Sequence, residues 1–170
     1  FGLGLNFIII LKNWSKVFGT IKRLHYFAIE SFPITKDNLR IAQQRFPGLA
    51  NEYQELIDKY PPIHAGFHRI WLKSGAVALT LIFEPTWRGI SQIEGRFDAW
   101  FLSQFSNESA PDHWSPGIFS EISRLSRKDT LICSSNTEPY VDDELKKIGY
   151  EVVGCSGDPS PAKVKIGRSW

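Results

Sequence analysis

Strand-like and helix-like segments alternate along most of this chain, and no other feature constrains its fold as strongly. Apolar, β-branched and aromatic runs predict strands at residues 24–29, 67–72, 77–83, 99–102, 131–133, 150–153 and 164–166. Helical spacing of apolar residues predicts helices over residues 5–14, 36–46, 49–57, 116–125 and 140–148. The alternation predicts an α/β fold with an open, mostly parallel sheet and helices on both faces.

Turn and capping residues support this division. Thr35 is the predicted N-cap of a helix that Pro47 ends, and Pro61 ends the helix after it. Residues 73–76 separate two strands closely enough to predict a hairpin. Ser115 and the proline after it are typical of a helix cap and first turn.

The composition is that of a folded globular protein. Hydrophobic residues make up 42% of the 170 residues and aromatic residues 14%, which argues against disorder and predicts one domain. The net charge of +2 is too small to indicate a nucleic-acid partner by itself. The apolar runs are too short to cross a membrane, so no membrane partner is predicted.

The cysteines and histidines exclude two kinds of site. Cys133 and Cys155 do not make a disulfide framework, which predicts a reducing, cytoplasmic location. His64 and His68 flank Gly66 and precede a strand, so we do not expect them on one helix face, and no metal site is predicted.

The chain contains no methionine, even at position 1. We therefore expect it to begin inside a longer reading frame, with any strand that leads into Gly2 lying upstream.

Gly2 and Gly4 precede an apolar run at residues 7–11, a pattern that predicts a turn entering a buried helix. The N–H groups at such a helix start suit a polar or anionic ligand. Glu30 follows the strand at residues 24–29, where a carboxylate of nucleotide-binding α/β folds accepts hydrogen bonds from ribose hydroxyls. A plain turn and a solvated acid remain the alternatives.

Ligands of open α/β sheets bind beyond the carboxyl ends of the strands. Residues 2–6, Glu30, Glu84 and residues 103–107 are all expected at that edge. The sequence therefore predicts that they converge on one site.

Several blocks together resemble a known family. The first seven residues, F-G-L-G-L-N-F, resemble the G-F-G-x-G-L-N-F loop of the methyltransferase domain of MnmC-type tRNA wobble-uridine modification enzymes. Similar blocks follow in order at residues 24–33, 67–69, 98–102 (D-A-W-F-L), 114–116 and 124–127 (R-L-S-R). The resemblance covers roughly residues 1–133 and thins afterwards.

The resemblance implies a Rossmann-like S-adenosylmethionine-dependent methyltransferase fold whose first strand is missing here. It implies methyl transfer to the aminomethyl group of wobble uridine in tRNA, as in 5-aminomethyl-2-thiouridine. Gly2, Gly4 and Asn6 would line the amino-acid end of S-adenosylmethionine, Glu30 would hold its ribose, and Glu84 would lie near its adenine. The flavin-dependent oxidase domain of many members is not among these residues, and we expect a monomer or a fusion with further domains.

The chain departs from the family at its expected catalytic segment. The family has F-L-D-G-F-A-P where this chain has F-L-S-Q-F-S-N, so Ser103 replaces an aspartate. A serine can hydrogen-bond but is not a useful base near neutral pH. Ser103 and Phe105 are nonetheless the catalytic candidates. The strand end before this segment also differs, because Pro85 after Glu84 removes a backbone donor.

The expected RNA-binding residues are also reduced. An Arg-rich segment of the family is acidic here, with Glu138, Asp142 and Asp143. The closing basic motif is limited to the predicted RNA contacts Lys163, Lys165 and Arg168. Further candidate contacts, which are equally ordinary surface charges or core aromatics, are Lys12, Lys16, Lys22, Arg23, Phe105 and Trp114.

Three functions stay open at this point. The chain is an active or weakened tRNA methyltransferase, a degenerate relative that binds cofactor or RNA without turnover, or an unrelated α/β nucleotide-binding module.

Overall fold

The structure, a computed structural model, describes residues 1–18, 23–102, 115–134, 139–154 and 165–169. The chain divides into two compact units, Phe1–Pro85 and Thr86–Trp170, and each is described by itself. In the part of the chain that the structure describes, no helix is both long enough and apolar enough to cross a membrane.

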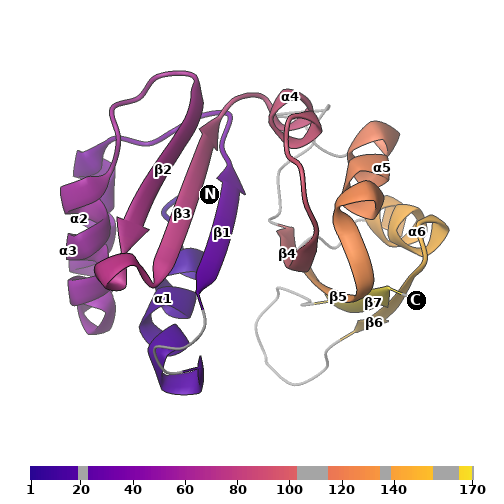
Figure 1. The fold of residues 1–170 in the computed structure, drawn as a ribbon, viewed down its shortest axis with the longest axis horizontal. Helices are drawn as coiled ribbons and strands as arrows, with labels where there is room; N and C mark the ends of the chain where they lie inside the picture. Colours follow the sequence, from indigo (N-terminus) through magenta and orange to yellow (C-terminus); the bar gives the residue numbers. More distant parts are fainter. Residues whose placement is uncertain (19–22, 103–114, 135–138, 155–164, 170) are drawn as a thin grey trace. The chain divides into compact units, whose positions relative to one another are not determined.

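Unit 1 contains a three-stranded sheet in the order β1-β3-β2. Its strands are β1 (Leu24–Ile29), β2 (Gly66–Leu72) and β3 (Val77–Phe83). β1 runs parallel to β3, and β2 runs antiparallel to it (Figure 1). A single 3-10 turn, η2 (Lys73–Gly75), joins β2 to β3, which confirms the predicted hairpin.

Three helices and a 3-10 turn complete unit 1. They are α1 (Leu5–Phe18), α2 (Lys36–Arg45), η1 (Pro47–Leu49) and α3 (Ala50–Lys59). Thr35 caps α2 as predicted, because its hydroxyl accepts from the N–H of Asn38. α1 extends beyond its predicted end at residue 14 to Phe18, since the residues that follow the apolar run contain no helix breaker before Gly19.

One hydrophobic core holds unit 1 together. Alternate residues of β3 are fully buried in it with residues from all three helices, among them Phe7, Leu39, Leu56 and Leu79. Burying a side chain of this size contributes about 1.5–3 kcal/mol. The core therefore fixes where the strands of unit 1 end.

Unit 2 contains a four-stranded sheet in the order β4-β5-β7-β6. Its strands are β4 (Phe97–Leu102), β5 (Ser126–Ser134), β6 (Tyr150–Gly154) and β7 (Lys165–Ser169). β4 is parallel to β5, and β7 is antiparallel to both β5 and β6. Within each described sheet all strands but one share a direction, in agreement with the predicted mostly parallel sheet.

The helices of unit 2 are α4 (Thr86–Ser91), α5 (Pro116–Leu125) and α6 (Pro139–Lys147). α5 and α6 match their predictions, and Ser115 with Pro116 begins α5. α4 was not predicted, because its six residues are too few for an apolar stripe. β5 begins at Ser126, five residues before the prediction, since its first residues are polar.

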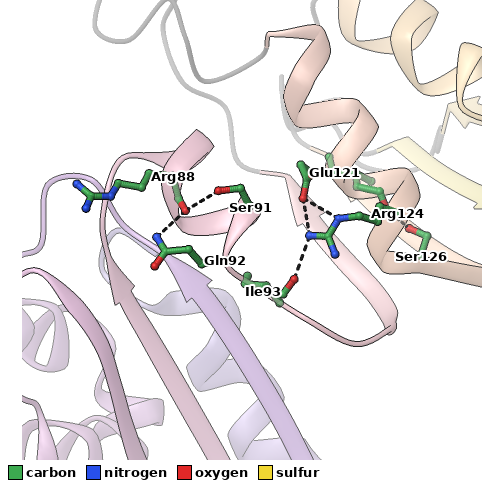
Figure 2. Close-up of polar contacts among 8 residues, drawn as sticks. Arg88, Ser91, Gln92, Ile93, Glu121, Arg124 and Ser126 are labelled. Carbon is green, nitrogen blue, oxygen red and sulfur yellow. Dashed lines mark hydrogen bonds and ion pairs between the residues drawn. The ribbon is translucent and has the colours of Figure 1, made fainter.

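Side-chain bonds to backbone carbonyls fix the segments around α4 and α5. The Arg124 guanidinium donates to the Ile93 carbonyl at 3.0 Å and also pairs with Glu121 (Figure 2). The Gln92 amide donates to the Arg88 carbonyl at 2.8 Å at the end of α4. Arg124 therefore connects α5 to the segment that leads into β4.

Candidate functional site

The chain begins with a tight turn, here called the glycine turn (residues 1–4). Gly2 and Gly4 have φ values of +55° and +72°, which side chains other than glycine adopt at a cost. The Gly4 N–H donates to the Phe1 carbonyl at 2.9 Å, and the Gly4 carbonyl accepts from Ile8 as α1 begins. The predicted turn before a buried helix is confirmed.

Glu30 lies directly after β1 and binds the glycine turn. Its Oε2 accepts from the Gly2 N–H at 2.9 Å and from the Phe1 amine at 3.0 Å, and its Oε1 accepts from the Phe32 N–H at 2.8 Å. The side chain is only 11% exposed. The Glu30 N–H donates to the Ile82 carbonyl, so the end of β1 is fixed against β3.

These contacts set the charge state of Glu30. Burial by itself raises the pKa of this carboxyl group. The Phe1 amine and the N–H groups of Gly2 and Phe32 together lower the pKa by more than burial raises it, so it lies below its usual value. Glu30 is therefore ionised at neutral pH.

Two tyrosines approach the site from α3 and from the residue that follows it. The Tyr53 hydroxyl donates to the Leu3 carbonyl at 3.1 Å and so holds the glycine turn from its other side. Tyr60 is 3% exposed, and its ring packs against Phe83 with the centroids 6.2 Å apart. Its hydroxyl is the one buried side-chain polar atom without a hydrogen-bond partner among the described residues. Burial, followed by the negative charge of Glu30, raises the pKa of Tyr60 to about 12.

Glu84 follows β3 as Glu30 follows β1. Its carbonyl accepts a long hydrogen bond of 3.4 Å from the Ser31 hydroxyl, so the two strand ends lie side by side. Asn6 is exposed in the first turn of α1, two residues after Gly4. We call Gly2, Glu30, Phe32, Tyr60 and Glu84 the Glu30 site.

The other predicted site residues belong to unit 2. Ser103, Phe105 and Lys163 lie outside the described residues. Lys165 and Arg168 lie in β7, between β5 and β6 in the sheet of unit 2.

Two further sequence candidates have structural contacts. Lys12 donates to the Gly48 carbonyl at 2.6 Å and so connects α1 to η1. The His68 ring contacts the His64 carbonyl at 2.6 Å. The described residues hold no group of His, Cys, Asp and Glu side chains suited to a metal ion.

The D-A-W-F-L and R-L-S-R blocks contact each other in unit 2. The Trp100 indole N–H donates to the Ser126 hydroxyl at 2.9 Å, and Arg127 pairs with Asp98. The sequence identified both blocks but did not predict this contact, because nothing in either block specifies its partner. In the described residues these side chains connect β4 to β5.

Ser126 is the centre of that contact. Its hydroxyl donates to the Ile122 carbonyl at 2.6 Å and contacts the Tyr150 hydroxyl at 2.7 Å. A serine hydroxyl has one proton, so Tyr150 must donate to it, as Trp100 does. The Ser126 hydroxyl therefore has its full complement of one donated and two accepted hydrogen bonds.

The Glu30 site brings together a glycine turn and an acid at a strand end, two features of nucleotide sites in open α/β sheets, and the sequence comparison decides the family. A profile described as S-adenosyl-L-methionine-dependent methyltransferase matches residues 47–159. The chain belongs to this family. The cofactor of this methyltransferase family is S-adenosylmethionine.

Individual methyltransferase relatives match the whole chain. The tRNA 5-methylaminomethyl-2-thiouridine biosynthesis bifunctional protein MnmC of Marinomonas sp. (strain MWYL1) is 33% identical over 168 residues, which are 99% of this chain and 25% of that protein. The protein of the same name from Pseudomonas entomophila (strain L48) is 32% identical over 100% of this chain and 25% of its own length. The chain thus spans about a quarter of the length of these curated relatives.

A solved structure confirms the methyltransferase fold. The crystal structure of MNMC2 from Aquifex aeolicus superposes with a TM-score of 0.75 over 99% of this chain and 50% of that one, at 18% identity. The Rossmann-like fold predicted from the sequence is therefore correct.

The residues of the Glu30 site fit the family's cofactor. A carboxylate has about four acceptor positions, and Glu30 uses three of them on N–H donors, so one remains for a hydroxyl group. The Tyr60 hydroxyl is a second polar atom, buried and without a hydrogen-bond partner among the described residues. An adenosyl ribose presents hydroxyl groups that suit both.

Proposed function

We propose that this chain is the methyltransferase part of an enzyme that methylates the aminomethyl group of wobble uridine in tRNA, the modification that yields 5-methylaminomethyl-2-thiouridine. The observation that carries the proposal is the match of the entire chain to proteins named for that biosynthesis. The Glu30 site supports it, because a methyltransferase must first hold its cofactor.

Each residue of the glycine turn and the Glu30 site then has a role. Gly2, Gly4 and Asn6 line the amino-acid end of S-adenosylmethionine, where the small glycines let a ligand approach the backbone. Glu30 accepts from the ribose hydroxyls, and Glu84 lies near the adenine. The bound cofactor supplies a methyl group on a sulfonium for in-line transfer to the neutral amine.

Ser103 and Phe105 belong to the segment that would meet the substrate. Ser103 can orient the amine through a hydrogen bond, but it cannot accept the amine's proton near neutral pH. Turnover is therefore expected to be weak while cofactor binding survives.

A degenerate relative that binds without turnover is the second candidate. It is favoured by Ser103 and by the acidic stretch with Asp142 and Asp143, where the family is Arg-rich. Asp143 pairs with Lys146 at 3.8 Å on the surface of α6, so this stretch offers RNA little net positive charge.

The tRNA contacts would come from Lys163, Lys165 and Arg168, whose charges neutralise phosphates. The protein would act in the cytoplasm, as a monomer or fused to further domains.

A methylation assay separates the two candidates. Labelled S-adenosylmethionine is mixed with tRNA that carries 5-aminomethyl-2-thiouridine, and transfer is measured for the wild type, Ser103→Asp and the matched control Ser103→Asn. The proposal expects slow transfer that Ser103→Asp raises at least tenfold, an effect typical of a restored proton acceptor, while Ser103→Asn gives no gain. Transfer that is absent in the wild type and in Ser103→Asp, with cofactor binding intact, would establish the degenerate relative.

A further inference from the structure

Tyr60 carries a hydroxyl group that the protein itself does not use. The residue is 3% exposed, and its hydroxyl has no partner among the described residues. A buried hydroxyl without a hydrogen bond costs about 1–3 kcal/mol, so native structures rarely contain one. Phenylalanine would fill the same space without this cost, and packing therefore does not explain a tyrosine here.

A backbone contact and a ring contact position Tyr60. Tyr60 is the C-cap of α3, with its N–H directed to the Ile57 carbonyl at 3.4 Å. Its ring lies against Phe83, the last residue of β3. The hydroxyl is therefore held at the carboxyl end of the sheet of unit 1, where the Glu30 site lies.

Glu30 is close enough to act on Tyr60 through its charge, yet the two do not bond. The negative charge of Glu30 raises the pKa of Tyr60, while the carboxylate bonds with Phe1, Gly2 and Phe32 instead. A hydroxyl that stays protonated and a carboxylate with one free acceptor position would both bond to a ligand hydroxyl, which can donate and accept at once.

Tyr53 provides the contrast within the same segment. It lies seven residues earlier and is fully buried, but its hydroxyl donates to the Leu3 carbonyl. Tyr53 thus supports the glycine turn, and its hydroxyl proton is used within the protein.

We propose that Tyr60 is a cofactor-binding residue, whose hydroxyl bonds to a ribose hydroxyl of S-adenosylmethionine while Glu30 accepts from the same ribose. This assignment rests on cofactor binding at the Glu30 site, as in the proposed function. It makes Tyr60 a specificity residue that distinguishes ribose from deoxyribose.

The test is calorimetric titration of Tyr60→Phe, with Tyr53→Phe as the matched control. The ligands are S-adenosylhomocysteine and its 2′-deoxy and 3′-deoxy analogues, and ligand-free melting is measured for each protein. Tyr60→Phe should weaken S-adenosylhomocysteine binding about tenfold, the loss of one hydrogen bond, and leave the ligand-free melting temperature equal or higher. Tyr53→Phe should lower that temperature.

The analogues identify the bond. For the analogue that lacks the hydroxyl contacted by Tyr60, wild type and Tyr60→Phe should bind equally. Unchanged affinity of Tyr60→Phe for S-adenosylhomocysteine, or a melting temperature lowered as in Tyr53→Phe, would mean that the hydroxyl bonds to buried water, and the assignment would be wrong. A tenfold loss that persists with both analogues would overturn the ribose contact. Failure of the wild type to bind S-adenosylhomocysteine would instead reject the cofactor site itself.

Discussion

Blocks that resemble the same family contribute to both the Glu30 site of unit 1 and the Ser126 contact of unit 2, but the hydrogen bonding of the two differs. Ser126 has one donated and two accepted bonds, all within the protein. At the Glu30 site, one carboxylate position and the Tyr60 hydroxyl remain open. A protein keeps an unsatisfied buried group at a cost, which is why we propose a ligand for the Glu30 site and only a packing role for the Ser126 contact.

A sequence block can be recognisable because its residues pack against one another or because they bind a ligand. Trp100 and Ser126 belong to blocks that resemble the family, and in the structure they connect β4 with β5. Tyr60 belongs to no recognised block, yet among the described residues its hydroxyl is the buried side-chain polar group without a hydrogen bond.

The largest effect is expected for Glu30→Gln. The two carboxylate oxygens of Glu30 accept from three N–H donors, whereas a glutamine has only one carbonyl oxygen. The free energy of unfolding should therefore fall by about 3 kcal/mol, as for a broken buried ion pair. S-adenosylmethionine binding should be lost. Urea denaturation and calorimetric titration measure these changes. The control is Glu121→Gln in the exposed pair with Arg124, which should cost less than about 1 kcal/mol and leave binding unchanged. Equal effects of the two variants would remove the distinction between the regions.

Ser126→Ala should have the next largest effect, and this effect should be on stability alone. Trp100 and Tyr150 would lose their Ser126 acceptor, which costs about 2 kcal/mol, while cofactor affinity stays at the wild-type value. Thermal and urea unfolding measure the loss. Ser120→Ala, which removes only an exposed bond to the Pro116 carbonyl, should lie within about 0.5 kcal/mol of wild type. A fall in cofactor affinity for Ser126→Ala would show that the Ser126 contact is not purely structural.

Gly4→Ala should have a smaller effect. An alanine at φ +72° costs about 1–2 kcal/mol, and its Cβ would lie 2.9 Å from the Phe1 ring unless that ring moves. We expect a lower melting temperature together with weaker cofactor binding. The control is Gly48→Ala, since a Cβ at Gly48 meets nothing within 4 Å. Wild-type behaviour of Gly4→Ala would contradict a rigid glycine turn.

The smallest effect concerns pH. The folded pKa of Glu30 lies below its usual value of 4.5, so its stabilising contribution is complete above that value and is lost as the pH falls through the folded pKa. The free-energy difference between wild type and Glu30→Gln should therefore shrink on acidification. Urea unfolding at neutral pH and at several acidic values measures this difference. A difference that stays constant down to pH 3 would show that Glu30 does not stabilise the fold through its charge.

Much of the fold followed from local patterns, because apolar periodicity, Thr35 and the proline positions determine elements directly. The early start of β5 could not be predicted, since polar side chains such as Thr130, which donates to the Phe97 carbonyl at 2.7 Å, hold it in place. The strand-end rule predicted that Gly2 and Glu30 lie at the same edge of the sheet, but not the hydrogen bond between them. The proposed role of Tyr60 could not be predicted, because nothing in the sequence distinguishes it from a core residue.

The bonds from Glu30 to Gly2 and Phe32 also bear on how fast a ligand can be recognised. In the proposed cofactor site, these bonds hold the glycine turn in one conformation before the cofactor arrives, so binding does not have to order this loop. The cofactor's affinity is then determined by direct contacts, with little loss to induced ordering, and its association needs no slow rearrangement of this loop.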